Sequence, residues 1–504
     1  MATLLLACVL AQAQAGGLSE FLTLQKSVEL TACRGEFESA PVTVVALQDV
    51  TIEAAAECKG IETDLRVVKA WWQAGYEVWD LSHKRIVDEL LLKDDRLVRV
   101  NRDRNYLRGQ DGTYTLCSGK DSRRLAGVLP QDAKTLQPVR MRAGEQRTFW
   151  LTVRVPEQAT AGPYAGTVAF SCAGGGKTRS VPLRVTVRDF DLSPPRLTYS
   201  LYYRAHLTDP GAPVVVNSDD KTEAQYRVEI ADMRDHGVTY PANYQGFEGL
   251  ERALQVRSEA GLPTGRFYTL GCNPGATPEE LANIRKWMDA LKPWGYSEVY
   301  FYGEDEATGE QLVAQKARWQ ATQAIGAKTF VAGYAGTFEA MGGLLNCAVY
   351  FGRPTEQEAA KWHGVGSSVL GYANPQVGVE DPLVYRRNYG LALWRSGFDG
   401  CMDYAYQHAF THIWNDFDDP DYRDHCFTYP TVDGVVGTLQ WEGFREGVDD
   451  VRYVTTLESL IPGAPADVGA AAQRFLNRID AGGDLDHIRS RVAEWIVKLR
   501  GAAK

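Results

Sequence analysis

The sequence changes its pattern at 191–195, where the run Asp-Leu-Ser-Pro-Pro separates two kinds of chain. Before it, short segments alternate apolar and polar residues, as in 28–31 (VELT), and Gly, Pro and polar turns separate them. This alternation is typical of β-strands with one buried face. Consecutive prolines block both helix formation and strand pairing, so we expect a domain boundary here. The chain at 18–192 is therefore predicted to be an antiparallel β-sandwich.

After the boundary, eight strand-like segments alternate with helical stretches. In the helical stretch 277–294, Pro278 lies in the first turn and two acidic residues follow it, which favours a helix start. Eight such repeats predict a (β/α)8 TIM barrel over 196–440, with a C-terminal helical segment, 441–504, packed on it. A doubly wound open sheet is the alternative, but no G-x-G-x-x-G follows the first strand. The eight segments are 198–206, 238–244, 266–272, 298–302, 329–334, 348–351, 368–373 and 400–406.

The first residues resemble an export signal. An apolar run at 3–10 precedes Ala-Gln-Ala at 13–15, which has the A-x-A form of a cleavage site. We therefore expect 1–15 to be a signal peptide and the protein to be exported, either periplasmic or extracellular. The run ending in Cys8 also resembles a lipoprotein attachment signal, although a soluble exported form is the favoured interpretation. No stretch reaches the roughly 20 apolar residues that a membrane span needs.

Charge and composition narrow the class of partner. Lys plus Arg total 54 against 64 for Asp plus Glu, which gives a net charge of −10 and argues against nucleic acid as the partner. The 12 Trp and 24 Tyr are flat, amphipathic side chains of the type that stacks on sugar rings. The nine cysteines are scattered and form no C-x-x-C pair, so we expect no metal site and no cofactor. A glycan is the favoured partner.

The strongest catalytic candidates follow the fourth predicted strand of the barrel. In a barrel of this kind, functional groups lie where the strands end, at the carboxyl face. Here the strand ends in Tyr302-Gly303 and is followed at once by Glu304, Asp305 and Glu306. Adjacent carboxylates repel one another, so burial raises the pKa of any one of them and favours a protonated acid that can donate its proton. The alternative is that these acids are solvated and cap the next helix.

Other strand ends carry Tyr, Asn and Gln, which would together form a polar, aromatic-walled pocket suited to a sugar. For each of these residues taken alone, packing in the core is the alternative. No G-x-S-x-G and no H-E-x-x-H occurs, so serine hydrolase and zinc protease chemistry lack support and acid chemistry remains. The candidate substrate-binding residues are Tyr203, Asn243, Tyr334, Tyr372, Asp403, Tyr404, Tyr406, Gln407 and Trp414.

Several segments together resemble a known family. The predicted sandwich closes with a G-E-Q turn at 144–146, an A-G-x-Y turn at 161–164 and a strand running V-T-V-R-D-F at 185–190. The barrel half carries Asp305-Glu306, then F-T-Y-P at 427–430, D-G at 433–434, W-E at 441–442 and R-E-G-V-D-D at 445–450. In this combination the chain resembles glycoside hydrolase family 123, which comprises retaining β-N-acetylgalactosaminidases with an N-terminal β-sandwich and a TIM-barrel catalytic domain.

The resemblance implies substrate-assisted catalysis, in which the 2-acetamido oxygen of the sugar attacks the anomeric carbon. Glu306 would protonate the leaving oxygen and later activate water, and Asp305 would hold the acetamido group and stabilise the oxazolinium-like intermediate. The family often has Pro after the acid pair, whereas Ala307 stands here. These expectations describe a retaining exo-glycoside hydrolase that removes terminal β-linked N-acetylhexosamine, with N-acetylgalactosamine favoured by the resemblance.

Two other functions remain open from the sequence. The first is a two-carboxylate glycosidase, in which Glu306 works with Asp403 or Glu442 on a sugar without an acetamido group. The second is a carbohydrate-binding barrel without activity. The separation of the carboxyl groups, and the response of binding and turnover to Glu306→Gln, would distinguish them.

Overall fold

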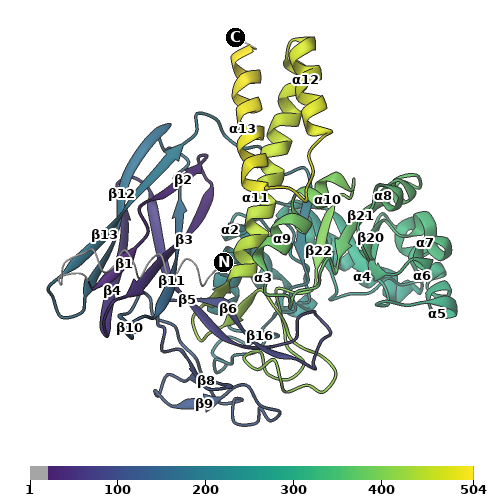
Figure 1. Cartoon of the computed structure of the whole chain (residues 1–504). Helices are drawn as coiled ribbons and strands as arrows, with labels where there is room; N and C mark the ends of the chain where they lie inside the picture. The colour runs from purple at the N-terminus through teal and green to yellow at the C-terminus, as the bar shows by residue number, and fades with distance from the viewer. Residues whose placement is uncertain (1–20, 503–504) are drawn as a thin grey trace. The chain divides into compact units, whose positions relative to one another are not determined.

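A computed structural model describes residues 21–502, and the chain divides into two compact units (Figure 1). Unit 1 comprises Met1–Trp71, Val87–Asn101 and Gln131–Leu192, and unit 2 comprises Trp72–Ile86, Arg102–Pro130 and Ser193–Lys504. The predicted signal peptide, 1–15, lies outside the described residues. The sequence placed all of 18–192 in one domain, whereas the structure assigns two segments of it, 72–86 and 102–130, to unit 2.

Unit 1 is built from two β-sheets (Figure 1). Its strands alternate between buried and exposed residues, as in β2 and β13, so each presents one face to a core. The first sheet contains, in spatial order, β1 (Leu22–Leu24), β3 (Phe37–Ala46), β11 (Gln146–Arg154), β5 (Glu62–Ala74) and β6 (Lys84–Leu92). The second contains β10 (Val139–Met141), β4 (Val50–Cys58), β12 (Gly162–Cys172), β13 (Thr178–Val187) and β2 (Val28–Ala32).

The two sheets share a core. Phe149 of β11 and Phe170 of β12, one from each sheet, lie edge to face with ring centroids 5.2 Å apart. Most neighbouring strands are antiparallel, as predicted, but β13 and β2 run parallel. A long stretch of chain separates β2 from β13, and only a tight hairpin would require antiparallel pairing. The β-rich character of this half is thus confirmed, with one pair of strands in the other direction.

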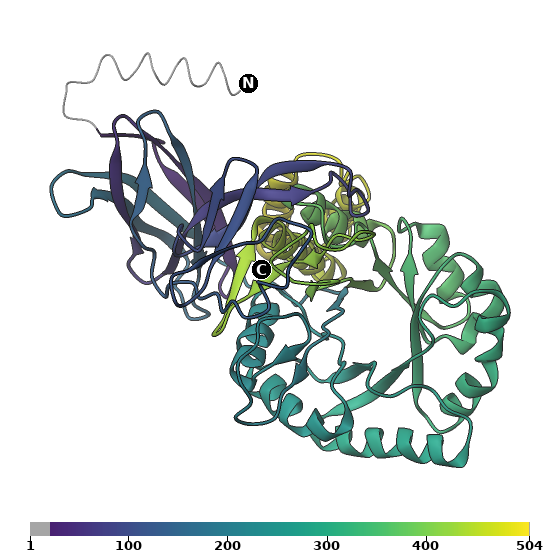
Figure 2. The ribbon, with the colours of Figure 1, turned by 90° about the horizontal axis from the view of Figure 1, so that it is seen from below.

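Unit 2 contains a sheet of seven parallel strands. Nearly every residue of these strands is buried, as expected for a parallel sheet covered on both faces. Figure 2 shows the teal and green helices on the outer side of this sheet. In spatial order the strands are β14 (Thr198–Leu201), β22 (Gly400–Asp403), β21 (Ser368–Tyr372), β20 (Cys347–Phe351), β19 (Lys328–Gly333), β18 (Tyr296–Tyr302) and β17 (Gly265–Thr269).

The remaining predicted strand, 238–244, is not a regular strand. Its backbone nevertheless reaches both edges of the sheet, because the Ala242 amide donates to the Leu201 carbonyl at 2.9 Å and the Asn243 amide donates to the Tyr268 carbonyl at 2.8 Å. Pro241 lies inside the segment and has no N–H to contribute, which explains the interrupted pairing. Seven of the eight predicted barrel strands are confirmed, and the eighth position is an irregular bridge.

Helices follow the strands as the alternating pattern predicted. The predicted helix start at Pro278 is confirmed in α4, where the Thr277 side chain accepts from the Glu280 amide and Glu280 bonds back to the Thr277 backbone. The helices of this part are α2 (Glu223–Asp235), α3 (Leu250–Glu259), α4 (Pro278–Leu291), α5 (Gly309–Ala314), α6 (Lys316–Ala324), α7 (Gly336–Met341), α8 (Glu356–His363), α9 (Pro382–Tyr389) and α10 (Leu391–Arg395).

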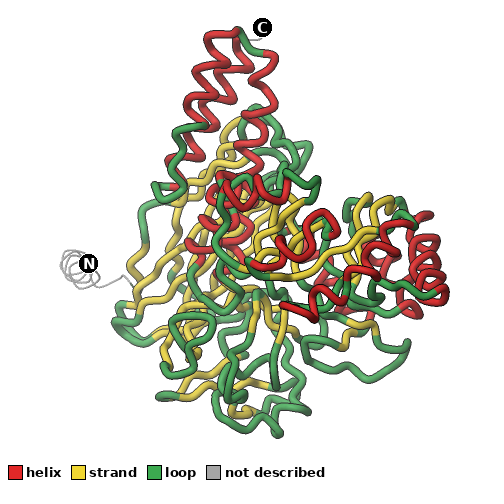
Figure 3. The backbone as a smooth tube through the Cα atoms, turned by 90° about the vertical axis from the view of Figure 1, so that its right-hand side faces the viewer, coloured by secondary structure: helices red, strands yellow, loops and turns green. Residues whose placement is uncertain are grey.

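The end of the chain is helical, as predicted from Trp441 onward. Three helices, α11 (Leu439–Leu460), α12 (Ala466–Leu476) and α13 (Leu485–Ala502), run side by side (Figure 3). Helix α11 approaches α9 closely, because a Cβ at Gly443 would lie 2.1 Å from the carbonyl oxygen of Pro382. Only glycine allows that approach.

Short strands complete unit 2. Each is paired with a neighbour that is close in the sequence. The pairs are β8 (Arg104–Arg108) with β9 (Tyr114–Leu116), β15 (His206–Leu207) with β16 (Asp220–Lys221), β23 (Gln407–His408) with β24 (His425–Cys426), and β25 (Thr428–Pro430) with β26 (Val435–Thr438). Strand β7 (Val98–Asn101) precedes β8.

Candidate active site

A cavity of about 770 Å³ lies at the carboxyl ends of the parallel strands, the edge at which ligands bind in sheets of this kind. Asp305 and Glu306 line it, and they are the only carboxylates among its described lining residues. Most of the remaining wall is aromatic. The tyrosines that line it are Tyr202, Tyr244, Tyr302, Tyr334, Tyr372, Tyr404 and Tyr422.

The loop that carries the two acids is tightly constrained. Strand β18 ends at Tyr302, and a Cβ at the next residue, Gly303, would lie 2.6 Å from the ring of Trp319. The following amide, of Glu304, donates to the side chain of Gln315 at 2.7 Å. Glu306 has a φ of 49°, a left-handed conformation that is uncommon outside glycine. Such a conformation costs free energy and is retained where the surrounding structure enforces it, often at functional sites.

Asp305 is held by one tyrosine hydroxyl. Tyr302 donates to its carboxylate, and the Tyr302 and Tyr202 hydroxyls lie 3.1 Å apart. Burial raises the pKa of Asp305 above its ordinary value, and the neighbouring charge of Glu306 raises it further, while the hydrogen bond from Tyr302 acts in the opposite direction. The result is a carboxylate whose protonation depends on one donor and one neighbouring charge.

Glu306 is held by two different tyrosines. Tyr372 donates to one carboxylate oxygen at 2.7 Å, and Tyr334 donates to the other. Burial raises the pKa of Tyr334 to about 12, and its hydrogen bond to Glu306 adds to the effect. The pKa of Tyr372 is raised for the same reasons. Both hydroxyls therefore stay protonated and fix the orientation of Glu306 near neutral pH.

The wall on the Asp305 side is polar. Arg204 pairs with Asp219 at 2.8 Å and donates to the Tyr404 hydroxyl at 3.3 Å. Nδ1 of His408 lies 3.0 Å from the same hydroxyl. Burial lowers the pKa of His408 to about 3 and that of His425 to about 4. Both imidazoles are therefore neutral at physiological pH and offer hydrogen bonds rather than protons.

Three of the nine candidate substrate-binding residues line the cavity, namely Tyr334, Tyr372 and Tyr404. The other six lie in the packed interior, and most of their polar groups bond to the protein itself. Tyr203 donates to Glu229 at 2.7 Å and Tyr406 donates to Asp232 at 2.9 Å. The six residues outside the cavity are Tyr203, Asn243, Asp403, Tyr406, Gln407 and Trp414.

The other four candidate residues also make polar contacts inside the protein. The side-chain amide of Asn243 donates to the Gln245 carbonyl at 2.9 Å, and that of Gln407 donates to Thr428 at 2.8 Å. The Trp414 indole donates to the Pro430 carbonyl at 2.9 Å. Asp403 is fully buried and accepts from the Tyr404 amide at 2.9 Å. The polar groups named here therefore bond within the protein.

For three of these six candidates, a neighbouring residue lines the cavity instead. Tyr202, Tyr244 and His408 line the cavity, whereas their neighbours Tyr203, Asn243 and Gln407 do not. Successive side chains of extended backbone point to opposite sides, so a shift of one position exchanges the cavity-facing residue for a core residue. The predicted candidates therefore lie at strand ends that border the cavity, one position from the side chains that line it.

The partners proposed for a two-carboxylate mechanism also lie elsewhere. Asp403 is inside the core, and burial raises its pKa well above the ordinary range. Glu442, on α11, is buried and pairs with Arg445 and with His236. Neither residue lines the cavity with Glu306.

Several exposed aromatic residues at the cavity were not anticipated. Trp79, Phe351, Phe410 and Tyr422 all line it, and Trp79 is 52% exposed. Trp79 lies in the 72–86 segment, between β5 and β6. Its ring contacts Tyr422 and His425, each with a centroid distance of 5.7 Å. No local sequence signal connects this turn with residues more than 300 positions later.

Three further features bear on cofactors and location. Within residues 21–502, no group of three or more His, Cys, Asp or Glu side chains is arranged to hold a metal ion. No helix of the described chain has the length and apolar character of a membrane span. The eight described cysteines are free thiols.

Comparisons with known proteins give one informative likeness. No family model and no curated protein matches the chain. Its structure is similar to that of a family 123 glycoside hydrolase from Clostridium perfringens, solved in work on glycolipid glycan hydrolysis, with a TM-score of 0.60. The similarity covers 95% of this chain and 94% of that one at 10% sequence identity. Identity this low establishes the fold alone, and at that level the resemblance found in the sequence is confirmed.

Two further solved structures are less similar. β-Glucuronidases from Parabacteroides merdae and Bacteroides uniformis each give a TM-score of 0.32, with 9% and 11% sequence identity. They cover 85% and 84% of this chain, and 52% of their own chains in both cases. A TM-score this low supports no inference about function.

Proposed function

We propose that this chain is a glycoside hydrolase related to family 123, which removes terminal β-linked N-acetylhexosamine with retention by substrate-assisted catalysis. The observation that carries the proposal is the pair Asp305 and Glu306 in a tyrosine-lined cavity, with each carboxylate held by different hydroxyls. Two adjacent acids with separate partners suit two different tasks. The fold, shared with a family 123 enzyme, supports the same assignment.

The two acids have different roles in the proposed reaction. The acetamido carbonyl oxygen forms a bond to C1 while the bond from C1 to the leaving oxygen breaks, and Glu306 gives its proton to that oxygen. Asp305 accepts a hydrogen bond from the acetamido N–H and stabilises the positive charge of the oxazolinium-like intermediate. Water then attacks C1, Glu306 takes its proton, and the acetamido group is restored.

The choice of sugar rests on the resemblance alone. N-Acetylgalactosamine is favoured because family 123 enzymes act on it, and the similar structure belongs to work on glycolipid glycans. The lack of another carboxylate among the described cavity residues supports substrate assistance over a mechanism with an enzyme nucleophile. The aromatic wall of the cavity also suits a neutral sugar ring.

Release of 4-nitrophenol from the β-N-acetylgalactosaminide and from the β-galactoside tests the proposal. We expect the parent protein to hydrolyse only the acetamido sugar, and Asp305→Asn and Glu306→Gln each to reduce kcat by at least about a hundredfold. Asp403→Asn is a matched control, because it removes a carboxylate from the core rather than from the cavity. Equal hydrolysis of both sugars by the parent would exclude substrate assistance. Sugar binding without turnover would favour a binding protein.

We also propose that the mature protein is exported. The basis is the A-x-A site at 13–15 after the apolar run at 3–10. Mass spectrometry of the protein recovered from its native host is expected to show an N-terminus at Gly16. A lipid-modified Cys8 at the N-terminus would instead identify a lipoprotein.

A further inference from the structure

A second groove lies beside the cavity. It has a volume of about 1220 Å³ and shares Phe351 with the cavity. We call it the arginine groove, because four arginines line it. They are Arg353, Arg387, Arg395 and Arg478.

The groove adjoins the cavity on the side of Glu306. The Phe351 ring packs against Tyr334 and Tyr372 with centroid distances of 5.5 and 5.7 Å. Those two tyrosines are the ones that donate to Glu306. In the proposed reaction Glu306 gives its proton to the leaving oxygen, so the leaving group must lie on this side. Phe351 is 37% exposed and is available to pack against it.

The arginines of the groove are not neutralised by ion pairs. None of the four has a carboxylate oxygen of a described residue within 4.0 Å, in a chain whose net charge is −10. Two neighbouring arginines of helix α9 differ in their partners. Arg386 pairs with both Asp450 and Asp486, whereas the Nε atom of Arg387 is buried and has no hydrogen-bond partner. A buried donor without a partner is costly, and a ligand oxygen would satisfy it.

The acidic residues of the groove do not cancel this charge. Glu77, Glu356 and Asp480 also line it, which leaves four cations against three anions. Arg395 uses its guanidinium on the Leu476 and Asn477 carbonyls, the latter at 2.8 Å. Arg353 and Arg387 are therefore the two guanidiniums best placed for a ligand, since Arg353 follows the shared Phe351 by two residues.

The opposite wall of the groove is held in place. Tyr76 and Glu77 come from the 72–86 segment, whose backbone carbonyls accept hydrogen bonds from two arginines. Arg85 donates to the Gly75 carbonyl at 2.6 Å, and Arg423 donates to the Glu77 carbonyl at 3.4 Å.

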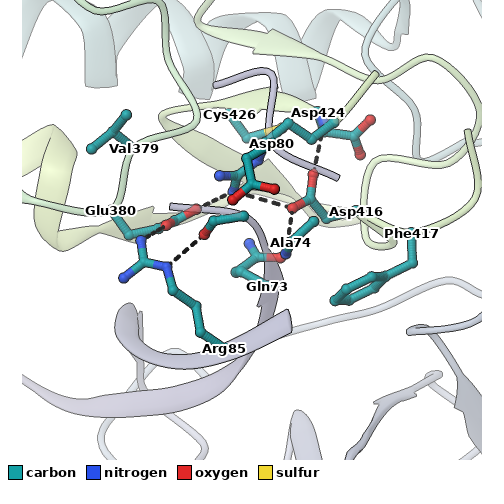
Figure 4. Close-up of polar contacts among 12 residues, drawn as sticks. Gln73, Ala74, Asp80, Arg85, Val379, Glu380, Asp416, Phe417, Asp424 and Cys426 are labelled. Atoms are coloured by element: carbon teal, nitrogen blue, oxygen red, sulfur yellow. Dashed lines mark hydrogen bonds and ion pairs between the residues drawn. The ribbon is translucent and has the colours of Figure 1, made fainter. Parts of the chain in front are cut away.

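Figure 4 shows the ion-pair cluster to which Arg85 belongs. Arg85 and Arg423 both pair with Glu380, and Arg423 also pairs with Asp416 at 3.1 Å. Asp416 in turn accepts from the Ala74 amide at 2.9 Å. Fixed geometry of this segment lowers the entropy that is lost when a ligand binds, so the groove is suited to binding.

We propose that the arginine groove binds the leaving-group part of the glycan, and that Arg353 and Arg387 select a leaving group that carries an anionic oxygen group, either a sulfate ester or a carboxylate. This inference rests on the proposed function, because Glu306 defines the leaving-group side. Guanidinium groups bind both kinds of anion through paired N–H donors. The substrate class is then an acidic glycan that ends in a neutral N-acetylhexosamine.

The test compares three disaccharides with the same β-linked terminal N-acetylgalactosamine. The second sugar is galactose, galactose 6-sulfate or glucuronic acid, and release of N-acetylgalactosamine gives kcat/KM. We expect the parent to prefer at least one acidic disaccharide by about tenfold or more, as for one or two charge-assisted hydrogen bonds. That preference should fall as the salt concentration rises. The two acidic substrates distinguish a sulfate site from a carboxylate site.

The variants Arg353→Gln and Arg387→Gln are expected to abolish the preference and leave kcat/KM for the neutral disaccharide within twofold. Arg184→Gln removes an exposed arginine of β13 in unit 1 and serves as the charge-matched control. A parent that hydrolyses all three disaccharides equally, or Arg353→Gln and Arg387→Gln variants that keep the preference, would overturn the inference.

A binding measurement separates this inference from the proposed function. Titration calorimetry with galactose 6-sulfate, glucuronic acid and galactose tests the groove without any turnover. Arginine-dependent binding of an acidic monosaccharide would support the groove even if no substrate were cleaved. A protein that cleaves the neutral disaccharide but binds no acidic sugar would retain the proposed function and lose the inference.

Discussion

At the scale of single residues, the chemistry depends on how differently two neighbouring carboxylates are held. Asp305 has one tyrosine donor and Glu306 has two. Burial and the charge of Glu306 raise the pKa of Asp305, and the Tyr302 hydroxyl opposes them. Since Asp305 must be ionised to stabilise a positive intermediate, its pKa is expected to set the acidic limb of the pH profile.

Tyr302→Phe tests this directly. Loss of the donor should raise the pKa of Asp305 further, so the acidic limb of kcat/KM against pH moves to higher pH. The lost hydrogen bond stabilises the charged form of Asp305, so we expect kcat/KM to fall more at acidic pH than at neutral pH. Tyr203→Phe removes a hydroxyl that bonds to Glu229 and serves as the control. An unchanged acidic limb would contradict the role given to Tyr302.

Asp418 gives a stability prediction with a defined sign. Burial raises its pKa to about 6, and the Ser122 hydroxyl partly opposes this. Between its ordinary pKa of about 3.9 and this value the folded state binds more protons than the unfolded state, so stability falls as pH rises through that window.

The variant Asp418→Asn should therefore gain stability relative to the parent at pH 8 and not at pH 4. After allowance for partial exposure we expect about 1 kcal/mol. Urea unfolding at the two pH values measures it. Equal differences at both pH values would show that the carboxyl is not strained by burial.

At this scale the sequence predicts residue types better than orientations. The candidates Tyr203, Asn243 and Gln407 lie one position from the residues that face the cavity, Tyr202 and Tyr244 among them. Composition and strand position are local properties. Which side of an extended segment faces the cavity depends on the register of the whole sheet. A strand that is buried on both faces has no alternation of apolar and polar residues, so its sequence does not indicate which side that is.

At the scale of elements, the 72–86 segment depends on buried charge. Glu380 is nearly inaccessible and pairs with Arg85 and Arg423. Removal of one partner from a buried ion pair leaves an uncompensated charge and costs about 3–5 kcal/mol.

We expect Glu380→Gln to lower the free energy of unfolding by about 3 kcal/mol and to raise KM, because Trp79 and Tyr76 lie on the segment that the cluster holds. Urea unfolding followed by tryptophan fluorescence, together with steady-state kinetics, measures both effects. Glu494→Gln breaks the exposed pair with Arg491 and should cost less than about 1 kcal/mol. Similar losses for the two variants would contradict a structural role for the cluster.

Elements with strong local signals are predictable from sequence. Helix α4 has its capping box and its proline at the first turn, and seven strands follow the expected alternation. The 238–244 segment failed as a strand because of Pro241, whose missing N–H is itself visible in the sequence. The parallel pairing of β2 with β13 has no local signal, since it joins residues about 150 positions apart.

At the scale of the molecule, the interleaved units predict the behaviour of a truncated chain. Residues 193–504 alone lack 72–86 and 102–130, which belong to the same unit. Asp416 would lose the Ala74 amide, and the Asn415 side chain would lose the Gly119 carbonyl at 2.7 Å.

We expect the 193–504 fragment to show no cooperative thermal unfolding and no hydrolase activity, whereas residues 16–504 show both. Circular dichroism against temperature and the 4-nitrophenol assay make the comparison. A fragment that unfolds cooperatively and is active would show that the two inserted segments are dispensable.

The prolines at 194–195 indicate the boundary between the two units in the sequence. They do not indicate that 72–86 and 102–130 belong to unit 2. Strands β5 and β6 each cross from one unit to the other. Each crossing lies inside a regular strand, between 71 and 72 in β5 and between 86 and 87 in β6, so no turn or break in the sequence indicates it. Assignment of a segment to a unit needs tertiary contacts.

The alternation of the two units along the chain also limits how recombination can change the gene. A recombination event at the codon for Ser193 would transfer the parallel sheet without Trp79, Tyr76 and the amide that satisfies Asp416. The product would lose part of its cavity wall and a partner of its buried acid in the same event. Selection is therefore expected to pass the two units on together, and homologous exchange should succeed only where it spans both.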